Sequence, residues 1–114
     1  MSNWQIFGTR KCQETRKAER FLKGLGIKFQ LIDLKEKPIS KGELNSISRS
    51  IPLKDLINTQ GSEYKKRNLQ YLKHDIESEL LAHPLLMNTP VVRLGQRATV
   101  GYQPEIWKQW LSDN

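Results

Sequence analysis

The sequence predicts an α/β fold with a four-stranded mixed sheet, and patterns at the two ends of the 114-residue chain predict it. The first third shows a strand, an amphipathic helix and a second strand, an order that normally gives a parallel pair with a right-handed crossover. The end of the chain shows two strands around a tight turn, followed by a helix. The segment between them, at about 38–86, has helical periodicity. Helices covering one mixed sheet are the natural packing for this β-α-β, helical insert, β-β-α order.

The first third of the chain supplies the first two strands. Residues 4–7 form a short apolar strand, and an amphipathic helix runs from Cys12 to about Lys23. A Gly-Leu-Gly sequence then ends this helix, as glycines at a helix C-terminus do. Residues 28–34 are predicted to form the second strand.

The middle segment is predicted to contain four short helices. Ser40 and Glu43 form a capping-box pattern at the start of the first helix. Pro52 suits the first position of the second helix. Ser62 and Asp75 can cap the remaining two.

The end of the chain is predicted to be a β-hairpin and a closing helix. Strands at 91–94 and 97–100 flank a Gly-Gln turn, and glycine in the first turn position is typical of a type II′ turn. Pro104 lies near the first turn of the closing helix. Its apolar residues are expected to form one broad face: Ile106, Trp107, Trp110 and Leu111.

Composition bounds the class of protein. We expect a single domain over residues 1–114, long enough to bury a core, because 37% of the residues are hydrophobic and 27% are charged. No apolar run is long enough to span a membrane, and the N-terminus lacks a signal-peptide pattern. The single cysteine rules out an intramolecular disulfide, so we expect a reducing compartment, the cytoplasm.

The net charge of +7 is dispersed along the chain. It could attract an anionic substrate or an acidic partner, or could simply solvate the surface. The sequence has no zinc-ligand cluster, Gly-rich phosphate loop or aromatic-studded basic strand. We therefore expect a monomer with no bound cofactor or metal and no direct binding of nucleic acid.

The most informative residue is Cys12, the only cysteine, at the start of the first helix. Free backbone N–H groups and the positive end of the helix dipole favour an anion there, so they lower the pKa of a thiol. A lone cysteine is often just a small buried apolar residue, but Cys12 projects away from the centre of the helix's apolar stripe. We therefore predict a reactive thiolate. Positive charge within one turn comes from Arg10, Lys11, Arg16 and Lys17.

Three segments carry a family resemblance: residues 7–22 around Cys12, residues 52–64, and residues 85–105. Together they resemble the ArsC-like branch of the thioredoxin superfamily, which holds glutaredoxin-linked arsenate reductases and Spx-type transcription regulators. The resemblance covers nearly the whole chain. It implies a thioredoxin-like fold, a bacterial source and a nucleophilic role for Cys12.

In arsenate reductases of this branch three arginines hold the oxyanion, and this sequence matches none of them. The arginine of the insert aligns with Asn58 or with Gln60, the second with Thr89, and the third with Tyr102. Because a hydrogen bond to a charged group contributes roughly 1.5–3 kcal/mol, we do not expect efficient arsenate reduction.

The resemblance also implies a docking site for a thiol substrate. In thioredoxin-like folds the proline that matches Pro90 is usually cis and stands beside the reactive cysteine, and the residue before it, here Thr89, offers backbone hydrogen bonds to a bound peptide or glutathione. Arg10 and Arg16 are the expected cationic contacts, and the residues that replace the family's arginines would add uncharged polar ones.

The leading hypothesis is a monothiol oxidoreductase linked to glutathione or glutaredoxin. Cys12 is its nucleophile, and Thr15 stands where a Cys-x-x-Cys motif would have its second cysteine. The alternative is an Spx-like, non-catalytic protein that binds RNA polymerase, and a third reading is a relative that retains only the fold. His74 and His83 lie outside the segments expected near Cys12, so we interpret both as surface or helix-cap residues.

Overall fold

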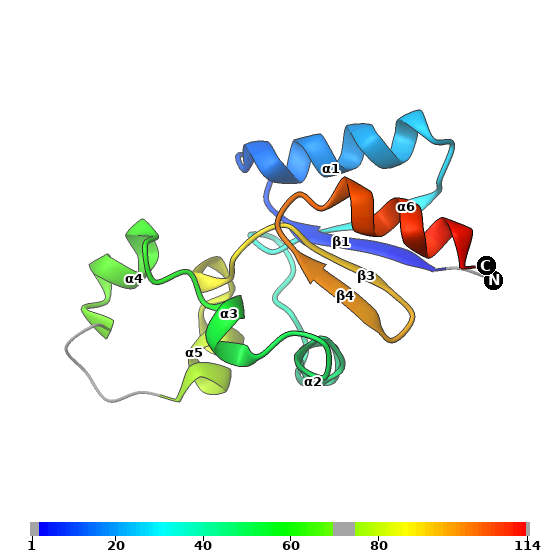
Figure 1. Cartoon of the computed structure of the whole chain (residues 1–114). Helices are drawn as coiled ribbons and strands as arrows, with labels where there is room; N and C mark the ends of the chain where they lie inside the picture. Colours follow the sequence, from blue (N-terminus) through cyan, green and yellow to red (C-terminus); the bar gives the residue numbers. More distant parts are fainter. Residues whose placement is uncertain (1–2, 70–74, 114) are drawn as a thin grey trace.

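The computed structural model describes residues 3–69 and 75–113 and has the four-stranded mixed sheet that the sequence predicts (Figure 1). The strand order is β2-β1-β3-β4, with β1 parallel to β2 and antiparallel to β3, and β3 antiparallel to β4. The strands are β1 (Trp4–Gly8), β2 (Phe29–Asp33), β3 (Val91–Leu94) and β4 (Arg97–Val100).

The central strand β1 contributes to a hydrophobic core on each face of the sheet. Trp4 and Ile6 belong to one cluster, whereas Phe7 belongs to the other. This alternation follows from the period of two in a strand, which turns successive side chains to opposite faces. Strand β1 is therefore mostly apolar, because both of its faces are covered along most of its length, and only Gln5 is partly exposed.

Helices α1 (Gln13–Gly24) and α6 (Pro104–Ser112) cover one face of the sheet (Figure 1). Trp107 is fully buried, and its indole N–H donates to the Thr99 hydroxyl at 2.9 Å. Trp110 is also buried and stacks at an angle on Trp4. Within the predicted apolar face of α6, Ile106 and Leu111 are each 37% exposed. Trp107 and Trp110 fill the contact between α6 and the sheet, and Ile106 and Leu111 lie at the edge of this contact.

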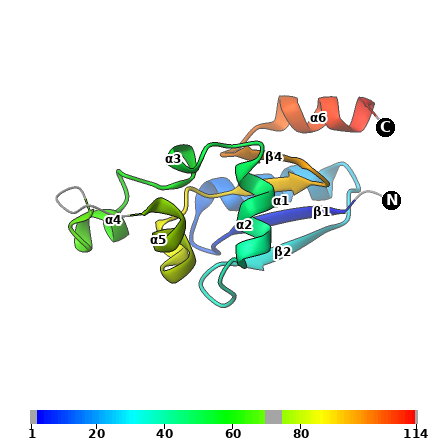
Figure 2. The ribbon, with the colours of Figure 1, turned by 90° about the horizontal axis from the view of Figure 1, so that it is seen from below.

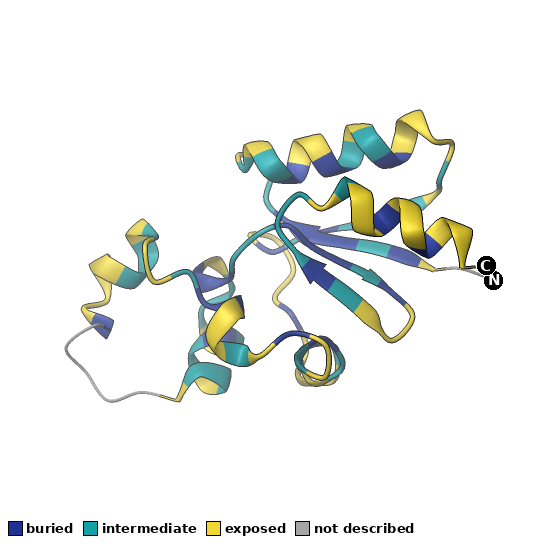
Figure 3. Cartoon of the chain, viewed as in Figure 1, coloured by how far each residue is buried: buried dark blue, intermediate teal, exposed yellow. Residues whose placement is uncertain are grey.

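The predicted insert lies on the opposite side of the sheet, where its first helix crosses the sheet face and its later helices extend beyond the end of the strands (Figures 1 and 2). Its core joins Phe7, Ile32 and Val91 of the sheet to the apolar residues of the short helices. Burial is concentrated on the sheet and on the helix faces turned towards it (Figure 3). The elements of the insert are α2 (Lys41–Ser48), α3 (Leu53–Leu56), α4 (Ser62–Lys66), α5 (Ile76–Ala82) and the 3₁₀ turn η2 (Pro84–Leu86).

The predicted caps are found close to their expected positions. Ser40 and Glu43 form a complete capping box, and the Asp75 carboxylate accepts from the Ser78 amide. Pro52 precedes α3 as its N-cap instead of occupying the first helical position, and Ser62 follows the N-cap of α4. Helix boundaries commonly shift by one residue in this way.

The turn between β3 and β4 is the predicted two-residue hairpin. Gly95 has a φ of +61°, the sign that the first position of a type II′ turn requires. In the described part of the chain, no helix is long and apolar enough to cross a membrane.

Candidate functional site

Cys12 is the N-cap of α1, immediately after the turn that follows β1. Its backbone N–H donates to the Thr9 carbonyl at 3.2 Å, and its own carbonyl accepts from the Arg16 amide at 3.2 Å. The first bond closes the turn, and the second begins the helix. The turn after β1 therefore places the cysteine at the N-terminus of α1, as the sequence predicts.

The segment before β3 brings Thr89 against the thiol. The Thr89 hydroxyl donates to Cys12 Sγ at 3.2 Å. The Cys12 thiol in turn donates to the Thr89 carbonyl oxygen at 3.8 Å. The Thr89-Pro90 peptide bond is cis, which confirms the expectation from the resemblance. Neighbouring elements hold this segment in place, because the Gly101 amide donates to the Pro90 carbonyl at 2.8 Å and the Asn88 amide donates to Leu56 at 2.6 Å.

Thr15 lies under the thiol, one helical turn after Cys12, and only 1% of it is exposed. Within the described residues, no group meets the geometry of a full hydrogen bond with its hydroxyl. The side chain fits because residue 8 is glycine: a Cβ at Gly8 would collide with the Thr15 hydroxyl and methyl groups. Sequence reasoning treated Thr15 only as the replacement for a second cysteine. Its polarity on the buried stripe of α1, in step with Ala18 and Leu22, was the signal for a further role.

The surroundings of Cys12 have opposing effects on the pKa of its thiol. Partial burial raises the pKa, because it disfavours the charged form. The nearby Thr15 hydroxyl, the hydrogen bond from the Thr89 hydroxyl and the backbone amides of Thr15 and Glu14 all lower the pKa, because they favour the thiolate. Together these donors outweigh burial, so the pKa lies below its ordinary value.

The cations that the sequence places around Cys12 are turned towards solvent. Arg10 and Arg16 are exposed, and Arg10 pairs with Asp33 at 3.5 Å. Lys17 pairs with Glu14 on the helix surface at 3.3 Å. Water and salt screen such exposed charges strongly. The lowered pKa of Cys12 therefore comes from neutral hydrogen-bond donors, whereas the sequence led us to expect a contribution from neighbouring cations.

The other expected contacts lie in their own local structures. In a tight turn of the insert, the Asn58 side-chain oxygen accepts from the Gln60 backbone N–H at 3.1 Å. The Asn58 backbone N–H donates to the Leu86 carbonyl at 2.8 Å. The Tyr102 ring packs edge-on against Phe21 and Trp107. Of the predicted substrate-binding residues, Thr89 is the one that the described hydrogen bonds join to the Cys12 sulfur.

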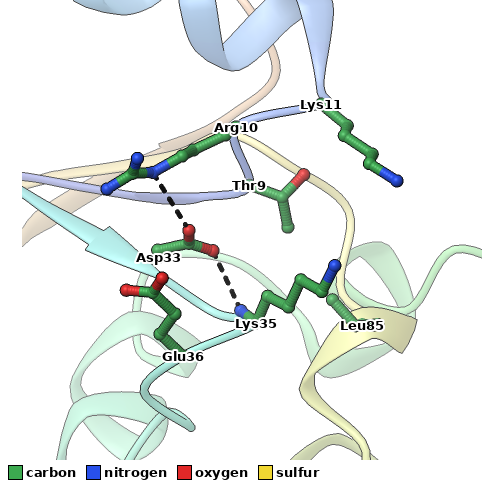
Figure 4. Close-up of a pocket in the computed structure, with 7 residues that line it drawn as sticks. All are labelled: Thr9, Arg10, Lys11, Asp33, Lys35, Glu36 and Leu85. Atoms are coloured by element: carbon green, nitrogen blue, oxygen red, sulfur yellow. Dashed lines mark hydrogen bonds and ion pairs between the residues drawn. The ribbon is translucent and has the colours of Figure 1, made fainter.

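A cavity of about 630 Å³ opens beside the turn that carries Cys12 (Figure 4). It lies where the parallel strands β1 and β2 end, the edge at which ligands of open α/β sheets commonly bind. Among its residues, the sequence analysis named Arg10 as a substrate contact and Lys11 as a nearby cation. Lys35 and Glu36 could have been sought in the residues that follow the second strand. The cavity is lined by Thr9, Arg10, Lys11, Asp33, Lys35, Glu36 and Leu85.

The described residues contain no group of three or more histidine, cysteine, aspartate or glutamate side chains that could hold a metal ion. His83 is the C-cap of α5, in agreement with its interpretation as a helix-cap residue. His74 lies outside the described residues.

The sheet order, with a cysteine at the start of α1 facing a cis-proline segment, defines a thioredoxin-like protein. Residues 7–110 match the model of the ArsC family, and the chain belongs to that family. The resemblance inferred from the sequence is therefore confirmed.

Two relatives and one solved structure illustrate the similarity. The chain is 31% identical over 106 residues to the "Uncharacterized protein YusI" of Bacillus subtilis (strain 168), with 87% of this chain and 90% of that protein covered. It is 29% identical over 111 residues to the "Global transcriptional regulator Spx 2" of Oceanobacillus iheyensis, with 93% and 82% covered. The arsenate reductase from Vibrio cholerae superposes with a TM-score of 0.80 at 23% identity, over 94% of this chain and 96% of that one. That last likeness shows the fold alone.

Proposed function

We propose that this protein is a monothiol oxidoreductase in which Cys12 is the nucleophile. The observation that carries the proposal is the convergence of donors from α1 and from the Thr89-Pro90 segment on one thiol. Such donors stabilise the thiolate, which is the nucleophilic form of cysteine. Two separate parts of the fold thus favour the same protonation state.

The proposed cycle is a pair of thiol–disulfide exchanges. The Cys12 thiolate attacks one sulfur of a disulfide, the S–S bond breaks, and a mixed disulfide forms at Cys12 while the other sulfur leaves as a thiolate. A second thiolate, from glutathione or from glutaredoxin, then attacks the substrate's sulfur in the mixed disulfide and releases Cys12. An external thiol is needed because the chain has a single cysteine, with Thr15 three positions after it.

Arsenate is a less favourable substrate in this proposal. The positions that match the family's three arginines hold uncharged residues, and the nearby Arg10 is engaged with Asp33. An oxyanion in the transition state needs preorganised donors, and each missing one typically costs about 10²–10³ in rate. We therefore expect little arsenate turnover.

The experiment that tests the function is reaction of the protein with glutathione disulfide, followed by mass spectrometry. We expect one glutathione adduct on wild type, none on Cys12→Ser, and removal of the adduct by glutathione and glutaredoxin. A wild-type protein that forms no adduct would contradict the proposal. Protection of Cys12 from alkylation by arsenate would instead favour the reductase activity.

A second candidate function is suggested by the similarity to the Spx 2 regulator over 93% of this chain. In this alternative the protein binds RNA polymerase without catalysis. Binding of purified RNA polymerase by wild type and equally by Cys12→Ser would support it. Absence of binding at micromolar concentrations would contradict it.

A further inference from the structure

We infer that the cavity beside Cys12 binds the carboxylate of a small disulfide substrate, and that Lys11 and Lys35 select for this negative charge. The inference rests on the proposed function, because it assumes that the substrate's sulfur reacts at Cys12. It adds the chemical class of the substrate: a low-molecular-weight disulfide whose carboxylates lie near its sulfur atoms.

The cavity lies between the two segments that form the thiol site. Thr9 and Lys11 belong to the turn that ends at Cys12, and the Thr9 carbonyl accepts from the Cys12 amide. Leu85, on another wall, belongs to η2, which leads into the chain before Thr89. A ligand in the cavity therefore contacts the turn that ends at Cys12 and the 3₁₀ turn that precedes the Thr89-Pro90 segment.

The charges that line the cavity leave two cations available to a ligand. The Asp33 carboxylate is already occupied, since one oxygen pairs with Arg10 and the other accepts from the Lys35 amide at 3.0 Å. In the part of the chain that the structure describes, neither Lys11 nor Lys35 has an ion-pair partner for its ammonium group. An anionic ligand would supply that partner.

Figure 4 shows that these cations share one part of the cavity. The amino groups of Lys11 and Lys35 extend to the side on which Leu85 lies, whereas the Glu36 carboxylate lies on the side of Arg10. Leu85 is 46% exposed and offers an apolar contact beside the two ammonium groups. This side therefore suits a carboxylate attached to a short carbon chain and disfavours a cationic ligand.

The volume of about 630 Å³ sets the size of the ligand. Cavities of roughly 300–1,000 Å³ typically hold small molecules. Because Lys11 of the lining directly precedes Cys12, we expect a peptide-sized disulfide such as glutathione disulfide to place one carboxylate there with its sulfur at Cys12. The reaction remains the exchange described above: one S–S bond breaks, a bond to Cys12 Sγ forms, and a thiolate leaves.

The test compares three disulfides of different charge: anionic glutathione disulfide, neutral 2-hydroxyethyl disulfide and cationic cystamine. The rate of mixed-disulfide formation at Cys12 is measured for each at low ionic strength. We expect wild type to react fastest with glutathione disulfide after each rate is divided by the rate of free cysteine with the same reagent. Equal normalised rates would overturn the inference.

Charge-reversal variants locate the effect. Lys35→Glu is expected to slow the reaction with glutathione disulfide about fivefold, the scale of an exposed ion pair, and to leave 2-hydroxyethyl disulfide unchanged. Lys11→Glu should also slow the reaction with glutathione disulfide. Because Lys11 adjoins Cys12 and its replacement can change the reactivity of the thiol itself, the rate of this variant is divided by its rate with 2-hydroxyethyl disulfide. Lys37→Glu is the matched control, since it makes the same change of charge on the same loop outside the cavity lining.

The outcomes separate the two proposals. If Cys12 reacts with none of the disulfides, the proposed oxidoreductase function fails. If it reacts with all of them and Lys37→Glu slows glutathione disulfide as much as Lys35→Glu does, the function stands and the cavity has no specific role. Loss confined to Lys11→Glu and Lys35→Glu supports the assignment.

Discussion

The thiol site and the neighbouring cavity adjoin each other in the chain, yet their chemistry differs. The groups that lower the pKa of Cys12 are neutral: threonine hydroxyls and backbone amides. The cavity is lined mainly by charged side chains, most of them exposed. Hydrogen-bond donors beside the sulfur act on that atom alone, whereas exposed charges act weakly and over a longer range. The comparison therefore assigns activation of the sulfur to the first region and selection of the substrate to the second.

The largest expected difference between the regions is in stability. Gly8→Ala places a methyl group against the buried Thr15 side chain and should lower the free energy of unfolding by about 1–3 kcal/mol. Lys35→Ala, at the exposed cavity wall, should change it by no more than about 0.5 kcal/mol. Urea unfolding measures both. Equal effects of the two substitutions would show that the close packing at Gly8 is unimportant.

The next effect is on reactivity towards every electrophile. Thr15→Val keeps the shape of the side chain but removes its hydroxyl, which should raise the pKa of Cys12 and slow alkylation by neutral iodoacetamide at pH 6 about tenfold. Thr15→Ser retains a hydroxyl and serves as the control. The valine variant should be at least as stable as wild type, because the lost hydroxyl has no full hydrogen bond within the described residues. A reactivity loss shared by both variants would indicate a packing effect instead.

A smaller effect is expected from salt on the second region alone. Raising the ionic strength from about 0.01 M to about 0.15 M shortens the Debye length from about 30 Å to about 8 Å. The reaction with glutathione disulfide should slow several-fold, about as much as in Lys35→Glu at low salt. Alkylation by iodoacetamide should not change. A matching loss with iodoacetamide would mean that exposed cations also activate the thiol.

The smallest expected effect is the pH dependence of stability that Cys12 contributes. Its pKa is lower in the folded protein than in the unfolded chain, so its contribution is fully present above the ordinary thiol value and disappears as the pH falls through the folded value. Wild type should therefore gain stability relative to Cys12→Ser as the pH rises through this interval. Urea unfolding of both proteins at matched pH values measures the difference. A constant difference across the interval would contradict the lowered pKa.

The sequence predicts much of the fold because its signals act locally. The Ser40 capping box, the hairpin glycine Gly95 and the cysteine at the start of α1 each depend on residues within a few positions. The cis bond before Pro90 was predicted from the family resemblance, and the backbone geometry confirms it. The apolar face of α6 was predicted, but the partial exposure of Ile106 and Leu111 was not, because the helical pattern does not say how wide the contact with the sheet will be.

The site was predictable only around its cysteine. The roles of Thr15 and Gly8 depend on how closely α1 approaches the end of β1, a distance that no local pattern encodes. Lys35 and Leu85 reach the cavity from segments far from Cys12 in the sequence, and their meeting depends on the parallel pairing of β1 with β2 and on the position of η2. The nearby cations were visible in the sequence, but their direction towards solvent was not.

The most direct test of this account is the pH profile of iodoacetamide alkylation of Cys12, measured in wild type, Thr15→Ser and Thr15→Val at low and at physiological salt. We expect a wild-type midpoint below that of free cysteine, unchanged by salt, retained in the serine variant and raised in the valine variant. A wild-type midpoint at the free-cysteine value, or one that salt shifts and Thr15→Val does not, would contradict activation of the sulfur by neutral hydrogen-bond donors.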